Sequence, residues 1–91
     1  VRAPGELSLH PPFPNPAPQQ TTLRFGLPTR TAVQVDIFDV LGRRVAAVVR
    51  DRLPPGRHTR RVPVDDLAPG TYFIRLHAGN ATRTQKLSVV R

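Results

Sequence analysis

Histidine and aspartate are the side chains of this sequence that could bind a metal ion or transfer a proton. The three histidines, His10, His58 and His77, are far apart along the chain. A zinc or catalytic centre needs several converging ligands, each oriented by further hydrogen bonds. The pair Asp65-Asp66 could bind calcium or act as an acid–base pair, but its place just before a Pro-Gly turn is typical of an exposed loop. We therefore predict no metal site.

Nucleophilic catalysis has equally little support. The only serines, Ser8 and Ser88, lie outside any Gly-x-Ser-x-Gly setting. The sequence has no glycine-rich phosphate loop. The absence of cysteine excludes thiolate zinc sites, iron–sulfur clusters and cysteine nucleophiles. We predict a protein that is not an enzyme and that needs no cofactor.

The chain is strongly basic, with a formal net charge of +8 from 14 basic and 6 acidic residues, and every basic residue except Lys86 is an arginine. Such charge could attract nucleic acid or another anionic partner. Nucleic-acid modules add stacked aromatic residues or a recognition helix, and the arginines here are dispersed. We therefore attribute them to a G+C-rich coding bias and predict no nucleic-acid partner. We also predict no transmembrane segment, because no apolar stretch approaches roughly 18–20 residues.

The elements that would position these side chains are short β-strands. Residues 1–19 are rich in proline and are predicted to form a linker with a short first strand, while residues 20–91 form the remainder of a single β-sandwich domain. After Gln20, apolar and polar residues alternate in short runs between Gly and Pro turns. We predict an all-β, seven-stranded antiparallel immunoglobulin-like (Greek-key) β-sandwich, with strands at 7–9, 21–27, 32–40, 43–50, 56–64, 70–78 and 81–90.

The alternation within each run also predicts which side chains face the core, because successive residues of a strand point to opposite faces. Phe38 falls on the face opposite to its apolar neighbours. The predicted inward side chains are Leu23, Phe25, Val33, Val35, Ile37, Val45, Tyr72, Ile74, Leu76 and Leu87.

The turns carry their own signals. Asp39 and Gly42 bracket a predicted four-residue hairpin loop, in which Asp accepts backbone N–H bonds and Gly tolerates a positive φ. Pro54-Pro55-Gly56 and Pro69-Gly70 suit type II turns. The run Leu67–Tyr72 resembles the tyrosine corner of Greek-key sandwiches, in which a tyrosine hydroxyl bonds back to the upstream chain.

Taken in order, these motifs resemble the C-terminal sorting domain (type A) of type IX secretion cargo proteins, found in Bacteroidetes and related bacteria. The resemblance covers residues 7–91. Arg60 departs from it, since the family tends to place an apolar residue there. The matching segments are Phe13-Pro14-Asn15-Pro16, the hairpin from Val33 to Val45, the glycine turns at Pro55–His58 and Leu67–Phe73, and the ending Lys86–Arg91.

This resemblance implies a module that directs a larger secreted protein through the periplasm and an outer-membrane translocon to the cell surface or the extracellular space. It also implies a cell-surface sortase as a second partner and an upstream catalytic or adhesive domain covalently attached. A chain that begins with Val rather than Met is expected to be a piece of a longer protein. The residues implied in signal recognition are Gly70, Tyr72, Lys86, Leu87, Val89, Val90 and Arg91, with structural turns at Asp39, Gly42, Pro69 and Gly70.

A second interpretation is a generic immunoglobulin-like adaptor, similar to the sandwich domain of the hook-capping protein, or a carbohydrate-binding accessory module. Sugar binding usually needs exposed aromatic rings, and this chain has four Phe, one Tyr and no Trp, mostly at predicted core positions. A parent gene that ends directly after Arg91 would favour sorting over the adaptor.

Overall fold

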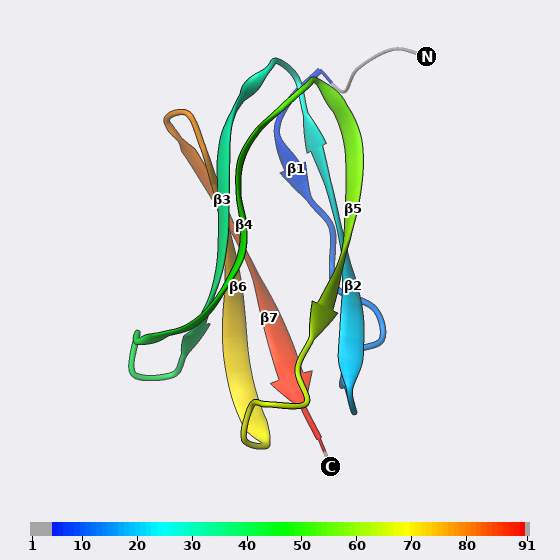
Figure 1. The fold of residues 1–91 in the computed structure, drawn as a ribbon, viewed down its shortest axis with the longest axis vertical. Helices are drawn as coiled ribbons and strands as arrows, with labels where there is room; N and C mark the ends of the chain where they lie inside the picture. Colours follow the sequence, from blue (N-terminus) through cyan, green and yellow to red (C-terminus); the bar gives the residue numbers. More distant parts are fainter. Residues whose placement is uncertain (1–4, 91) are drawn as a thin grey trace.

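The computed structural model describes residues 5–90, which form an all-β protein (Figure 1). This range contains seven strands and no helix, so the predicted fold class is confirmed. The strands are β1 (Ser8–Leu9), β2 (Gln20–Leu27), β3 (Thr31–Asp39), β4 (Arg44–Leu53), β5 (Gly56–Pro63), β6 (Gly70–Ala78) and β7 (Ala81–Val89).

Two antiparallel sheets pack face to face. One has the strand order β1-β2-β5 and the other has the order β4-β3-β6-β7. The chain crosses between the sheets from β2 to β3, from β4 to β5 and from β5 to β6, which is the Greek-key connectivity of an immunoglobulin-like sandwich. The strand ends Asp39, Gly70 and Val89 therefore lie at the same end of the molecule (Figure 1).

Alternating apolar side chains of both sheets fill the space between them. Nine of the ten predicted inward residues are buried, which confirms the alternation pattern in β2, β3, β6 and β7. The prediction for Val45 is wrong, because its side chain is 39% exposed. The nine are Leu23, Phe25, Val33, Val35, Ile37, Tyr72, Ile74, Leu76 and Leu87.

A β-bulge explains the exposure of Val45. Ile37 pairs with Ala46 and Phe38 pairs with Arg44, so Val45 is an extra residue with no partner on β3. An extra residue breaks the strict alternation of faces, so alternation along the strand no longer predicts that Val45 is buried. A second register shift leaves Val48 unpaired in the same way.

The glycine turns agree only in part with their predictions. Gly42 has a φ of 82°, as the predicted hairpin loop requires. Gly56 and Gly70 have φ values of 127° and 154°. These angles are positive but lie beyond the roughly +80° of a type II turn. The type II prediction is therefore wrong at both positions, although each still has a backbone that other residues rarely adopt.

The proline-rich segment lies against the sandwich from Leu7 onward. Leu7, Leu9 and Ala17 are buried with the core. Phe13 forms an isolated antiparallel bridge with Thr22 of β2, and Ala17 forms a parallel one with Val89 of β7. The division of the chain at residue 19 stays a prediction.

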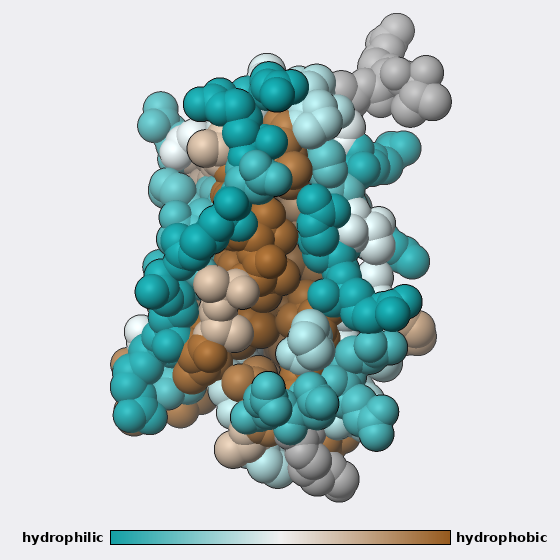
Figure 2. All heavy atoms as spheres, viewed as in Figure 1, coloured by the Kyte–Doolittle hydropathy of each residue, from teal (hydrophilic) through white to brown (hydrophobic). Residues whose placement is uncertain are grey.

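The two lateral sides of the sandwich differ. On the closed side, β1 and residues 13–17 connect β2 with β7. On the open side, β4 and β5 are the outer strands of their sheets, and no ladder joins them in the described chain. Figure 2 shows the open side, where an apolar band runs between two hydrophilic rims.

Candidate functional site

The side chain of Asn15 covers the outer edge of β7. Its Nδ2 donates to the carbonyl oxygen of Lys86 at 3.1 Å, and the backbone N–H of Ser88 donates to its Oδ1 at 2.9 Å. A carboxamide carries the same donor and acceptor as a peptide group. The Asn15 side chain therefore satisfies the outward backbone hydrogen-bonding groups of Lys86 and Ser88, as a residue of an additional strand would.

The backbone of Ala17 continues this pairing. The Ala17 N–H donates to the Ser88 oxygen at 2.8 Å, and the Val90 N–H donates to the Ala17 oxygen at 3.0 Å. Ala17 is fully buried. We call this arrangement the clasp, defined as Asn15 and Ala17 bonded to Lys86, Ser88 and Val90.

The same segment is fixed to the other sheet. The backbone groups of Phe13 and Thr22 exchange two hydrogen bonds, of 3.1 and 2.8 Å. The buried hydroxyl of Thr21 donates to the Pro14 oxygen at 2.8 Å. The clasp is therefore held rigidly between β2 and β7, which belong to different sheets.

The predicted tyrosine corner is present beside the clasp. The hydroxyl of Tyr72 donates to the Ala68 oxygen at 2.6 Å, and the residue is only 7% exposed. Gly70 pairs with Val89, and Tyr72 pairs with Leu87. The arch over Pro69 therefore lies directly against the terminal strand.

The structure brings the described residues of the predicted signal together but buries part of them. Leu87 is 0% exposed and Val89 is 2% exposed, so both stabilise the core and are inaccessible to a partner. Lys86 is exposed beside Phe73 on the outer face of the sheet, and Val90 is 41% exposed. Arg91 lies outside the described residues.

The Asp39 turn lies at the same end of the molecule, because Asp39 pairs with Tyr72 across β3 and β6. Asp39 Oδ1 accepts the N–H groups of Leu41 and Arg43, both at 2.9 Å. Its Oδ2 accepts the Arg43 Nε–H at 2.9 Å. The backbone hydrogen bond from Arg43, with the other Arg43 and Leu41 contacts, lowers the pKa of Asp39 below its ordinary value of 3.8.

Sequence reasoning missed a polar cluster on the outer face of the four-stranded sheet. Asp36 is only 5% exposed, and its carboxylate accepts bonds from Arg50 Nη2 and Gln34 Nε2, both at 3.0 Å. The Arg75 guanidinium lies 4.2 Å from the centre of the Phe38 ring, which explains why Phe38 is tolerated on this face. The outward alternation of Gln34, Asp36 and Phe38 was the available signal.

The candidate catalytic residues are scattered. His58 stacks on Phe25 with ring centres 5.4 Å apart, and the His77 ring bonds to Thr82. Within residues 5–90, no three His, Asp or Glu side chains are grouped as metal ligands. The same part of the chain contains no helix long and apolar enough to span a membrane.

A comparison with known protein families covers the part of the chain that holds these elements. Residues 12–90 match the family described as the Secretion system C-terminal sorting domain, and no curated protein matches the chain significantly. The matched region holds the clasp, the Asp39 turn, the arch and the described part of the terminal strand. This family is not a catalytic one, and the match favours sorting over the adaptor interpretation. The chain therefore belongs to the C-terminal sorting domains of type IX secretion, whose function is to direct export to the cell surface or the extracellular space by a secretion machinery.

Proposed function

We propose that an outer-membrane translocon recognises the folded module at the end where the clasp, the arch and the terminal strand meet. The observation that carries this proposal is the clasp. Asn15 bonds to Lys86 and Ser88 across sequence separations of 71 and 73 residues, so the first and last parts of the matched region form one surface. A signal that was only a linear tail would need no such contact.

The remaining steps follow from the same proposal. The module passes through the periplasm as the tail of an upstream catalytic or adhesive domain, and a cell-surface sortase then removes it. The module itself has no enzymatic activity. This is supported by the scattered positions of its histidines and by the hydrogen bonds that engage Asp36 and Asp39 in the structure.

The direct test fuses residues 7–91 to the C-terminus of a periplasmic reporter in a host with a type IX system. We expect the reporter on the cell surface. Deletion of Leu87–Arg91 is a poor probe, because losing the buried Leu87 and Val89 costs about 3–6 kcal/mol and would unfold a domain of this size. A fusion that remains in the periplasm although the module is folded would show that the proposal is wrong.

The cleaner probe is the double variant Lys86→Ala and Arg91→Ala. Lys86 is exposed, and exposed substitutions usually change stability by under about 0.5 kcal/mol. Reduced export with an unchanged melting temperature would show that the tail is recognised directly. Normal export would place recognition elsewhere on the sandwich.

A further inference from the structure

Exposed apolar side chains gather at the β3–β4 hairpin. Six large apolar side chains are exposed in the described chain, and four of them lie at this place. Leu41 is 73% exposed, Val40 66%, Val45 39% and Phe73 36%. Phe73 belongs to the group because it pairs with Phe38, which pairs with Arg44 on its other side. We call these four side chains the hairpin patch.

The fold does not require apolar residues at the tip of this hairpin. Asp39 and Gly42 set the turn, through the Asp39 hydrogen bonds and the Gly42 φ of 82°. Val40 and Leu41 lie between them with exposed side chains, at positions where turns favour small or polar residues. Two adjacent aliphatic side chains therefore stand in water without contributing to the core.

The tip is also presented rigidly. The Asp39 N–H donates to the Arg43 oxygen at 2.9 Å, and the Gly42 N–H donates to the Asp39 oxygen at 3.0 Å. The Asp39 carboxylate accepts three further bonds from Leu41 and Arg43. A pre-ordered loop loses little conformational freedom when it is bound, which favours a role in binding.

The surroundings of the patch are basic. Arg43 and Arg44 follow the tip, and Arg75 and Lys86 flank Phe73 on the sheet face. The two nearby carboxylates are both engaged, Asp39 by Arg43 and the largely buried Asp36 by Arg50 and Gln34. A partner that fits this surface has an apolar recess with acidic side chains at its rim.

We propose that the hairpin patch is the docking surface by which this module binds a protein of the secretion machinery, in a recess of that chemistry. The inference rests on the proposed function and adds a contact to it. A protein recess fits better than a lipid surface, because the patch continues from the hairpin tip onto the sheet face at Phe73. A flat membrane would contact the tip alone.

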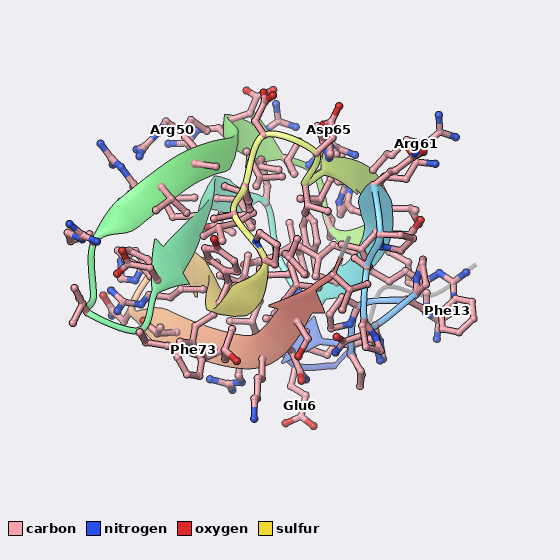
Figure 3. The ribbon with its side chains drawn as sticks, turned by 90° about the horizontal axis from the view of Figure 1, so that it is seen from below. Glu6, Phe13, Arg50, Arg61, Asp65 and Phe73 are labelled. Atoms are coloured by element: carbon pink, nitrogen blue, oxygen red, sulfur yellow. The ribbon has the colours of Figure 1, made fainter. Side chains whose placement is uncertain are left out.

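The first test is the double variant Val40→Ser and Leu41→Ser in the reporter fusion. Both side chains are exposed, so we expect a melting temperature within about 4 °C of the parent. We expect surface export to fall at least about tenfold. The matched control is Phe13→Ser, which is 76% exposed and lies well away from Phe73 (Figure 3). It changes only the side chain, and unchanged hydrogen exchange at the Thr22 amide, which donates to the Phe13 oxygen, checks that the anchor of the clasp is kept.

The outcomes separate this inference from the proposed function. Export of the parent but not of the double variant supports the docking surface. Export of both overturns it and leaves the sorting function intact, whereas failure of the parent fusion contradicts the function itself. Loss of export in Phe13→Ser as well would mean that exposed apolar surface in general is needed, which also overturns the inference.

A second measurement uses the absence of native cysteine. Leu41→Cys and Thr59→Cys, on an exposed position of β5, each introduce a single thiol for a cysteine-reactive crosslinker during export. We expect protein crosslinks from position 41 and not from position 59. Sedimentation of the purified module with phosphatidylglycerol vesicles, lost in the Val40→Ser and Leu41→Ser variant, would assign the patch to lipid and overturn the proposal.

Discussion

The closed and open sides of the sandwich protect their strand edges in different ways. On the closed side, the clasp pairs with the end of β7, and Gln85 Nε2 donates to the Leu9 oxygen at 2.9 Å. On the open side, β4 is interrupted by bulges at Val45 and Val48. Bulges and charges are common ways to keep edge strands from pairing with other chains. One edge is therefore satisfied by hydrogen bonds, and the other is only made unsuitable for pairing.

Arg60 is the clearest device on the open side. It pairs with Leu23, whose side chain is fully buried, so Arg60 occupies an inward-facing position of an outer strand. Its Nη1 donates to the Thr59 oxygen at 3.0 Å. An inward-pointing charge at an edge opposes the addition of another strand. We therefore expect Arg60 to keep the edge of β5 from pairing with another chain.

The largest difference between the sides should appear in core truncations. Leu87→Ala removes a fully buried side chain beside the clasp and should cost about 2–5 kcal/mol. Val48→Ala on the open side removes a half-buried side chain and should cost under about 1 kcal/mol. Urea unfolding of both variants measures the difference. If the two variants lost equal free energy of unfolding, the open side would be packed as tightly as the closed side.

The clasp can be tested by removing its side chain. Asn15→Ala loses two hydrogen bonds to β7, and we expect a loss of about 1–2 kcal/mol. The amide of Ser88 should exchange its hydrogen faster. Asn15→Asp keeps the acceptor for Ser88 but loses the donor to Lys86, so its effect should be intermediate. Unchanged exchange at Ser88 in Asn15→Ala would disprove the contact.

The hairpin that carries the open-side strand β4 depends on Gly42. Gly42→Ala should cost about 1 kcal/mol, because a Cβ is strained at a φ of 82°. No atom lies within 4 Å of the added Cβ, so the cost comes from the backbone alone. Gly5→Ala, which has equal space and no positive φ, is the matched control and should be neutral. A thermal melt compares them.

A smaller, pH-dependent effect should come from Asp39. Its pKa is lowered in the folded protein, so its stabilisation is present above the ordinary value of 3.8 and is lost as the pH falls through the folded pKa. Asp39→Asn should therefore be less stable than the parent at neutral pH, and the difference should shrink in acid. Gly42→Ala should lower the free energy of unfolding by the same amount at neutral and at acid pH. If the free energies of unfolding of the parent and of Asp39→Asn changed in parallel with pH, the stabilisation would not come from the Asp39 carboxylate.

The smallest stability change is expected for Arg60→Val, within about 0.5 kcal/mol. Its effect should appear in association, because an apolar inward residue would make β5 a better template for pairing. Sedimentation velocity at rising concentration should show dimers. Arg61→Val, on an exposed position of the same strand, is the control and should remain monomeric. If both variants remained monomeric, Arg60 would not be what keeps the edge of β5 from pairing with another chain.

The sequence predicted the strands well because alternation and turn residues are local signals. Predicted and observed bounds differ by no more than three residues at any strand end. Val45 could not be placed, because a bulge is decided by the register of two strands and leaves no mark in one of them. The Gly70 conformation was missed for a similar reason, since a Pro-Gly pair allows more than one turn.

The site was predictable only in its separate parts. The Tyr72 corner is encoded within one short segment, and its hydrogen bond to Ala68 is present. The Asn15 contacts span most of the chain, and no local pattern states which edge a distant amide will cover. Leu87 was predicted both to face the core and to belong to the signal, and its burial with that of Val89 leaves Lys86 and Val90 as the exposed described residues of the predicted tail. Their role in recognition stays a prediction.

The clasp has a consequence for what the sorting signal encodes. The sequence of residues 86–90 is the same in a folded, unfolded or damaged chain. Only the folded chain brings Asn15 and Ala17 against it and completes its edge. A machinery that recognises the clasp would therefore respond to the folded conformation of the tail and not to its sequence alone. A cargo protein whose tail had not folded would contain the same residues and would not be exported.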